Sequence, residues 1–214
     1  MPAVIFDVDG VLSDTNGFHV AARQHVLTSV GVRYEPSPAY SGMKDDVFFG
    51  LVLSRAGKKA VLHDLISQKN DFLVQHIRWS ALAMPEAVAC VTRLRKQFQL
   101  AVASSSELPV VRAILEKIGV ADAFPIVVTS EDVAEGKPSP DPYLKAAEKL
   151  GLAPNECVAI EDSRNGLLSA KRAGMKLIAV PDPGFPQNLN GADAHVTNLS
   201  EVTRELILKL ASGM

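Results

Sequence analysis

Acidic residues follow two apolar segments of the chain, at positions where their carboxylates could share one ligand. Asp7 and Asp9 come directly after one apolar run, and Glu161 and Asp162 come directly after another. If both runs are parallel strands of one sheet, ligands bind beyond the carboxyl ends of the strands, close to these residues. Neighbouring carboxylates repel each other unless a cation or a shared proton neutralises them, and Mg²⁺ prefers such oxygen ligands. The pattern predicts a magnesium site.

Each acidic pair also has an interpretation that needs no ligand. Asp9 and Gly10 are typical of a turn at the end of a strand. Glu161 and Asp162 are typical of an acidic pair at the N-terminus of a helix, where the helix dipole favours negative charge. For each pair taken alone, both interpretations stay open.

Two further segments carry groups that suit a phosphate. Ser104 and Ser105 follow a third apolar run and precede a helical pattern, so their hydroxyls and the free amide groups suit an anion. A serine at this position could equally cap the helix. Lys137 lies between Gly136 and Pro138, which hold it in place, although most loop lysines are simply solvated.

The elements that must position these residues follow from the apolar pattern. Five short runs predict strands that are buried on both faces, at 3–6, 99–103, 126–129, 157–160 and 177–180. Helical periodicity separates the later runs, and glycine ends two of these patterns, at Gly151 and Gly174. This alternation predicts an α/β fold with a doubly wound parallel sheet.

One interval departs from the alternation of strands and helices. Between residues 16 and 81 the sequence predicts three helices and no buried strand; the helices are at 18–30, 43–56 and 58–80. We therefore predict a small helical domain, 16–81, inserted after the first strand. The catalytic core is then formed by residues 1–15 and 82–214.

Composition excludes several classes of partner. The net charge of −2 gives no basic excess for nucleic acid or an anionic membrane surface. No apolar stretch approaches the length of a membrane span, and no signal peptide is expected before the first strand. Cys90 and Cys157 suit reduced core thiols. We expect a cytoplasmic protein, monomeric or weakly dimeric, that acts on a small phosphorylated metabolite.

Four segments in order resemble the motifs of the haloacid dehalogenase superfamily. These are Asp7-Val8-Asp9-Gly10-Val11, Ser104, Gly136 to Asp141, and Glu161 to Gly166. The resemblance covers nearly the whole chain, and the β-phosphoglucomutase-like phosphatases are the most similar subgroup. It implies a Rossmann-like core with a helical cap.

The resemblance also implies roles for matching residues. Asp7 resembles the nucleophile that forms a phosphoaspartate, and Asp9 resembles the general acid and base. Ser104 and Lys137 resemble the residues that hold the transferring phosphoryl group. Magnesium would be held by Asp7, the backbone carbonyl of Asp9, Asp162, and Glu161 directly or through water.

Residues of the predicted cap and two core residues complete the expected substrate site. His19 and Lys69 match cap positions of mutase-like members, although each could equally be an ordinary helix residue. The substrate-binding candidates are His19, Lys44, Lys69, Ser105 and Asn165. The mutase pattern has an arginine where this chain has Asp45, which removes a bidentate phosphate ligand.

We therefore predict a Mg²⁺-dependent phosphatase that hydrolyses a small phosphomonoester, a sugar phosphate, through a phosphoaspartate intermediate. The main alternative is a phosphomutase of the β-phosphoglucomutase type. A non-catalytic phosphosugar-binding protein is a third possibility, disfavoured because every catalytic residue type is present. A dehalogenase is disfavoured because Asp9 is present.

Overall fold

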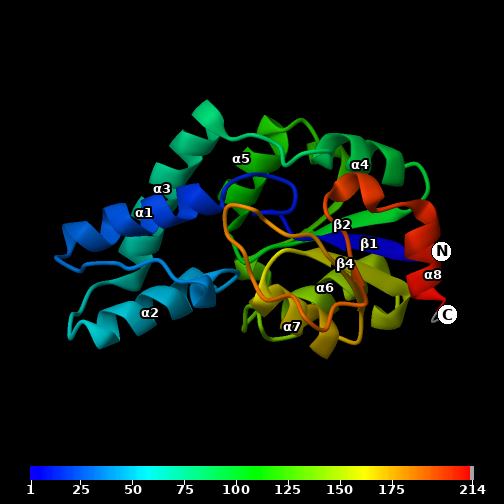
Figure 1. The fold of residues 1–214 in the computed structure, drawn as a ribbon. Helices are drawn as coiled ribbons and strands as arrows, with labels where there is room; N and C mark the ends of the chain where they lie inside the picture. Colours follow the sequence, from blue (N-terminus) through cyan, green and yellow to red (C-terminus); the bar gives the residue numbers. More distant parts are fainter. Residues whose placement is uncertain (213–214) are drawn as a thin grey trace.

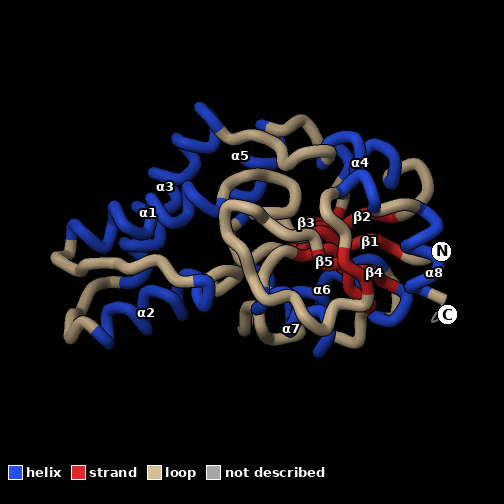
Figure 2. Tube along the Cα trace, in the orientation of Figure 1, coloured by secondary structure: helices blue, strands red, loops and turns tan. Residues whose placement is uncertain are grey.

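A parallel sheet of six strands forms the centre of the larger part of the molecule (Figure 1; Figure 2). The computed structural model describes residues 1–212. The strands are β1 Ala3–Phe6, β2 Gln99–Ala103, β3 Ile126–Val128, β4 Cys157–Glu161, β5 Lys176–Ala179 and β6 Ala194–His195. Their order is β3-β2-β1-β4-β5-β6, and every neighbouring pair is parallel. The predicted α/β class and the five predicted strands are confirmed.

The first strand occupies the middle of the sheet, between β2 and β4. Ala3 pairs with Gln99 on one side and with Cys157 on the other. The chain builds outward from β1 to β3 and then returns to β4, so the strand order reverses between β1 and β4. Ligands of open α/β sheets bind at such a point, beyond the carboxyl ends of the strands. Asp7 and Asp162 follow these two strands.

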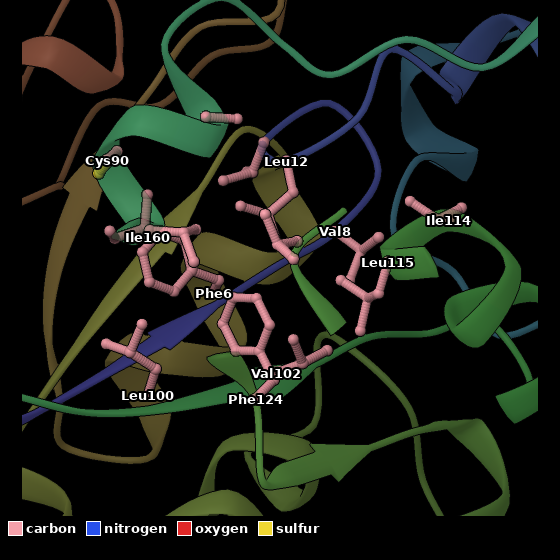
Figure 3. Close-up of a cluster of buried hydrophobic side chains, with 14 of the residues drawn as sticks. Phe6, Val8, Leu12, Cys90, Leu100, Val102, Ile114, Leu115, Phe124 and Ile160 are labelled. Atoms are coloured by element: carbon pink, nitrogen blue, oxygen red, sulfur yellow. The ribbon is translucent and has the colours of Figure 1, made fainter. Parts of the chain in front are cut away.

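Helices cover both faces of the sheet. They are α4 Ala87–Leu94, α5 Leu108–Lys117, α6 Asp141–Leu150, α7 Arg164–Arg172 and α8 Arg204–Ala211. Because side chains alternate along a strand, Val4 and Phe6 pack on one face with α4 and α5, while Ala3 and Ile5 pack on the other with α6 and α7. Figure 3 shows the first of these clusters, with Phe6 among the side chains of neighbouring strands and helices. This is the predicted doubly wound arrangement.

Three helices form a separate group on the side of the sheet away from the two chain ends (Figure 1). They are α1 Asn16–Ser29, α2 Asp45–Arg55 and α3 Leu62–Ser80. The group has its own apolar cluster, which includes Leu27, Phe48 and Phe49. Leu73 and Ile77 of α3 instead join the cluster of the sheet, so α3 packs on both parts. The predicted domain limits at 16 and 81 enclose these helices, and the division into two domains stays a prediction.

Two details differ from the sequence prediction. The third helix begins at Leu62 rather than at 58: Gly57, with a positive φ of 62°, follows the end of α2, and Val61 before the helix has an extended backbone. The strand β6 has two residues, too short to give a periodic pattern, and it was not predicted. Within the described residues, no helix combines the length and the apolar character needed to cross a bilayer.

Candidate active site

The carboxylate of Asp7 lies at the carboxyl edge of the sheet, next to a buried lysine. The backbone N–H of Asp7 donates to the carbonyl of Ile160 over 3.0 Å, which continues the pairing of β1 with β4 by one residue. Lys137 Nζ donates to Asp7 Oδ1 over 2.7 Å and to Glu161 Oε1 over 2.6 Å. The lysine side chain is fully buried, so it holds its two carboxylate partners in fixed positions.

Glu161 is the most fully hydrogen-bonded of the acidic residues. Tyr143 donates its hydroxyl to Oε1 over 2.9 Å, and Oε2 accepts from the backbone N–H groups of Asp162 and Ser163 and from the Ser163 hydroxyl. The carboxylate packs directly on Gly166, where an added Cβ would lie 1.8 Å from Oε1. Glu161 is therefore positioned to orient Lys137, with little capacity left for a direct metal bond.

Three carboxylates lie together at this edge of the sheet, and the ammonium group of Lys137 contacts two of them, Asp7 and Glu161. Ligand atoms of Asp7, Glu161 and Asp162 lie within 4.8 Å of one another, and all three residues are buried. Burial and the Glu161 carboxylate raise the pKa of Asp7 to about 7, although Lys137 opposes this. Burial and the same Glu161 raise the pKa of Asp162 well above its usual value. The cluster has more negative charge than its surroundings neutralise.

The donor set fits a hard divalent cation. Oδ1 of Asp162 is buried and has no hydrogen-bond partner, whereas Asp7 Oδ1 and Glu161 Oε1 accept from Lys137. A buried carboxylate oxygen without a partner is costly unless a cation completes its coordination. Oxygen ligands from Asp7 and Asp162, together with water and a phosphate oxygen, suit Mg²⁺. The carboxylate of Asp9 is not part of this cluster.

Asn16, the first residue of α1, fixes the second oxygen of Asp162. Its side-chain amide donates to Asp162 Oδ2 over 3.1 Å and to Asp182 Oδ2 over 2.8 Å. Gly10 makes this close approach possible, because a Cβ there would lie 2.2 Å from Asp162 Oδ2 and its φ is 81°. The amide thus connects the helical group, the expected metal ligand and the loop after β5.

Asp9 is held by a different set of neighbours. Oδ1 accepts from the Thr15 hydroxyl and lies 3.0 Å from Nε2 of His19, while Oδ2 accepts from the Ser106 hydroxyl over 3.2 Å. Burial alone would raise the pKa of Asp9, but His19 and the Thr15 hydroxyl outweigh it and hold the pKa below its usual range. Asp9 therefore stands as a carboxylate between the sheet edge and α1.

The remaining predicted residues are not all placed at the cavity. Ser104 is buried and accepts from the N–H of Ser106, and Ser105 donates to the carbonyl of Gly42 over 2.7 Å. Asn165 donates to the carbonyl of Ser41 over 2.7 Å, and Lys44 Nζ contacts the carbonyls of Val133 and Ala134. Ser105, Asn165 and Lys44 thus join the helical group to the core. Lys69 is fully buried and donates to Asp45 Oδ2 over 2.7 Å.

Several residues at the site were not identified from the sequence. Thr15 precedes α1 and Asn16 is its first residue, and no periodic signal distinguishes either of them. Asp182 follows the strand β5 by three residues, so the rule that found Asp162 could have found it. Ser106 directly follows the predicted residues Ser104 and Ser105, but its contact with Asp9 depends on the fold.

A cavity of about 250 Å³ adjoins Asp7, Asp9 and Asp162. The helical group contributes much of its wall, and the loop after β5 contributes Gly184 to Gln187. That loop extends toward α1 in Figure 1, and Gln187 donates to the carbonyl of Pro38 over 3.3 Å. A small ester could therefore place its phosphate near Asp7 and the rest of the molecule between the two parts of the chain.

Comparison with known proteins agrees with this geometry. The sequence profile of haloacid dehalogenase-like hydrolases matches residues 4–180. The chain belongs to this family. It is 31% identical to hexitol phosphatase B of Escherichia coli (strain K12) over 96% of both chains. It is 30% identical to β-phosphoglucomutase of Bacillus subtilis (strain 168), over 97% of this chain and 94% of that one. The predicted superfamily, subgroup and class of enzyme, a hydrolase, are confirmed.

A solved structure gives the same fold. The crystal structure of a mutant of CbbY from Rhodobacter sphaeroides, in complex with xylulose-(1,5)bisphosphate, has a TM-score of 0.83 and 27% identity. The alignment covers 94% of this haloacid dehalogenase-like chain and 96% of CbbY. The relatives thus include proteins named for a phosphatase and for a phosphomutase, so family membership alone does not choose between the two activities.

Proposed function

We propose that this chain is a Mg²⁺-dependent phosphatase that hydrolyses a small phosphomonoester, a sugar phosphate, through a phosphoaspartate on Asp7. The observation that carries the proposal is the pairing of Asp7 with Lys137 beside the buried, unpartnered oxygen of Asp162. Within one small region, Asp7 supplies a nucleophile, Lys137 a fixed cation and Asp162 a ligand for Mg²⁺. Relatives named phosphatase and phosphomutase support an organic phosphate as the substrate.

In the first step, a carboxylate oxygen of Asp7 attacks the phosphorus atom, and the bond from phosphorus to the leaving oxygen breaks. The products are an aspartyl phosphate and an alkoxide, which takes up one proton to become the alcohol. Asp9 is the donor we propose, because His19 Nε2 lies 3.0 Å from Asp9 Oδ1, so a proton held by the imidazole can reach the carboxyl group. General acid help of this kind typically accelerates a reaction by ~10²–10⁴-fold.

In the second step, water attacks the phosphorus atom of the aspartyl phosphate, and Asp9 accepts the proton that the water loses. Inorganic phosphate leaves, and the carboxylate of Asp7 is restored. Lys137 stays hydrogen-bonded to the acidic cluster and offsets the charge of the phosphoryl oxygens. Bound to Asp7, Asp162 and the Asp9 carbonyl, Mg²⁺ would neutralise part of the repulsion between carboxylate and phosphate.

The helical group would act as a cap that selects the leaving group. Ser105, Asn165 and Lys44 join it to the core, and its residues line the cavity beside Asp7. A closed cap excludes bulk water and completes a site. Substrate choice would then depend on the cap and on the loop after β5, while the chemistry depends on the sheet edge.

The test is a screen of purified protein with Mg²⁺ against hexose phosphates, hexitol phosphates and p-nitrophenyl phosphate, with inorganic phosphate as the readout. We expect release of phosphate that stops with EDTA and returns with excess Mg²⁺. Full turnover in metal-free buffer would contradict the metal requirement. Conversion of a hexose 1-phosphate to the 6-phosphate, with little free phosphate, would favour the mutase.

A further inference from the structure

Three charged side chains pack together in the helical group beside the cavity. Arg23 of α1 donates from its η2 nitrogen to Asp45 Oδ1 over 2.9 Å, and Lys69 of α3 donates to Asp45 Oδ2 over 2.7 Å. Arg23 and Asp45 line the cavity, whereas Lys69 is fully buried. Asp45 therefore lies between two cations, and each of its oxygens is committed to one of them.

The guanidinium group of Arg23 is almost fully used inside the protein. It makes four hydrogen bonds, two to Asp45 Oδ1 and one each to the carbonyls of Tyr40 and Met43. The ring of Phe48 covers one of its faces at 4.1 Å. A guanidinium has five N–H groups, and a phosphate needs two adjacent ones for a bidentate bond. Arg23 could bind a phosphate in this way only by releasing Asp45 or a carbonyl.

In the described chain, no other lysine or arginine lines the cavity and could bind a second phosphate in place of Arg23. Away from Asp7, Asp9, His19 and Asp162, the only charged residues of the described chain that line the cavity are Arg23 and Asp45. The other lining residues are uncharged, and several are aromatic or apolar: Tyr34, Pro36, Pro38, Tyr40, Met43, Phe185 and Pro186. Such a wall suits the carbon face and hydroxyl groups of a small polyol or sugar.

We infer that the cavity accepts a monophosphate with an uncharged leaving group, and that Asp45 disfavours substrates with a second phosphate by holding Arg23 and Lys69. The inference rests on the proposed function, because the phosphoryl group must lie at Asp7 for the leaving group to face Arg23 and Asp45. It assigns the choice between monophosphate and bisphosphate to one carboxylate. Asp45 is a specificity-determining residue and takes no part in the chemistry.

The test compares kcat/KM for a hexose 6-phosphate and the matching hexose 1,6-bisphosphate, with Mg²⁺ present. The wild-type protein should prefer the monophosphate by at least about tenfold, because charge-assisted hydrogen bonds to a second phosphate are missing. In Asp45→Asn, the released Arg23 should shift this ratio toward the bisphosphate by about 10- to 100-fold. Asp46→Asn is the matched control, since Asp46 is the next residue and its side chain is 45% exposed; its ratio should not change.

Asp45→Asn leaves two buried cations without a carboxylate and could fail to fold, so a second variant is needed. Asp45→Asn combined with Lys69→Met removes one cation with the anion and still releases Arg23, and it should show the same shift. Equal or better use of the bisphosphate by the wild type would overturn the inference. An equal change of kcat/KM for both substrates in the two variants would also overturn the inference.

A failure of the proposed function would look different. The folded wild-type protein would then release phosphate from neither sugar ester and not from p-nitrophenyl phosphate. Calorimetric binding of the same two sugar phosphates to the wild type would still decide the inference. Tighter binding of the monophosphate, reversed by Asp45→Asn or by the double variant, supports it, and tighter binding of the bisphosphate to the wild type contradicts it.

Discussion

The ammonium group of Lys137 lies 2.7 Å from Oδ1 of Asp7, and both side chains are buried. The lysine comes from a loop 130 residues further along the chain, so this contact exists only when the sheet is complete. It brings a cation to the carboxylate that would attack the phosphate. The same lysine contacts Glu161, which joins the ends of β1 and β4.

We predict that Lys137→Met lowers both activity and stability. Without the ammonium group, Asp7 and Glu161 are left as buried charges that repel each other, which typically costs about 3–5 kcal/mol of unfolding free energy. Loss of one preorganised charge at the phosphoryl group should lower kcat by about 10²–10³-fold. Phosphate release and urea unfolding measure the two effects. Lys145→Ala, at an exposed pair with Glu148, should change stability by less than about 1 kcal/mol.

Gly166→Ala tests the packing that holds Glu161. The added methyl group would lie 1.8 Å from Oε1 of Glu161, so the carboxylate must move and its bonds to Lys137 and Tyr143 must break. We expect a loss of about 1–3 kcal/mol in unfolding free energy, together with lower activity. Gly50→Ala is the control, because nothing lies within 4 Å of its Cβ position in α2 and alanine favours a helix. Equal stability of the two variants would contradict the packing argument.

Asn16→Ala should lower the affinity for Mg²⁺ more than it lowers the stability of the fold. The amide of Asn16 orients Asp162, and loss of such an outer partner typically lowers metal affinity by about 10–100-fold. The measurement is the Mg²⁺ concentration that gives half of the maximal rate, with thermal unfolding in EDTA as a check on the fold. Gln24→Ala, on the same helix and in contact with Thr28, should leave that concentration unchanged. A lower maximal rate at an unchanged Mg²⁺ requirement would argue against this role.

How far the sequence predicts this structure depends on how local the signal is. The run Ala3–Phe6 is wholly buried, so its unbroken apolar character identified β1 and, with it, the position of Asp7. The same reasoning from strand ends located Asp162, whereas Lys137 was identified by its position between Gly136 and Pro138. It could not show where a side chain points. Lys44 was expected at the substrate, but its Nζ contacts the carbonyls of Val133 and Ala134, because the chain folds the start of α2 against that loop.

Long-range pairs account for most of what the sequence does not reveal. Asp45 was identified only as a residue that stands where mutases have arginine. Its partners Arg23 and Lys69 lie on two other helices, and no local pattern relates the three positions. Asn16 and Asp182 meet in the same way, since the start of α1 and the loop after β5, which are far apart in sequence, lie side by side. Such contacts follow from tertiary structure and not from periodicity.

The stability contributed by Asp45 should depend on pH in a defined direction. Burial opposes ionisation of Asp45, but Lys69 and Arg23 outweigh it and hold its pKa below the usual value. A carboxyl group with a lowered pKa stabilises the folded state above its unfolded pKa, about 3.9, and loses that effect as the pH falls further. The difference in unfolding free energy between wild type and Asp45→Asn should therefore be largest at pH 6–7, at about 3–5 kcal/mol, and shrink below about pH 4. A difference that is constant from pH 7 to pH 3 would contradict the ion pair.

We propose that Asp7 carries the phosphoryl group during turnover. Asp9→Asn should slow the hydrolysis of the aspartyl phosphate by ~10²–10⁴-fold, because the water loses its general base, so the intermediate should accumulate when the leaving group of the substrate needs no general acid. Asp14→Asn, at an exposed position nearby, should not accumulate the aspartyl phosphate. The most direct measurement is mass spectrometry of Asp9→Asn quenched in acid during turnover of p-nitrophenyl phosphate, whose leaving group needs no general acid. We expect a phosphoryl group on the peptide that contains Asp7, and its absence when Asp7 is changed to Asn. A phosphoryl group on any other residue, or turnover by Asp7→Asn at the wild-type rate, would contradict it.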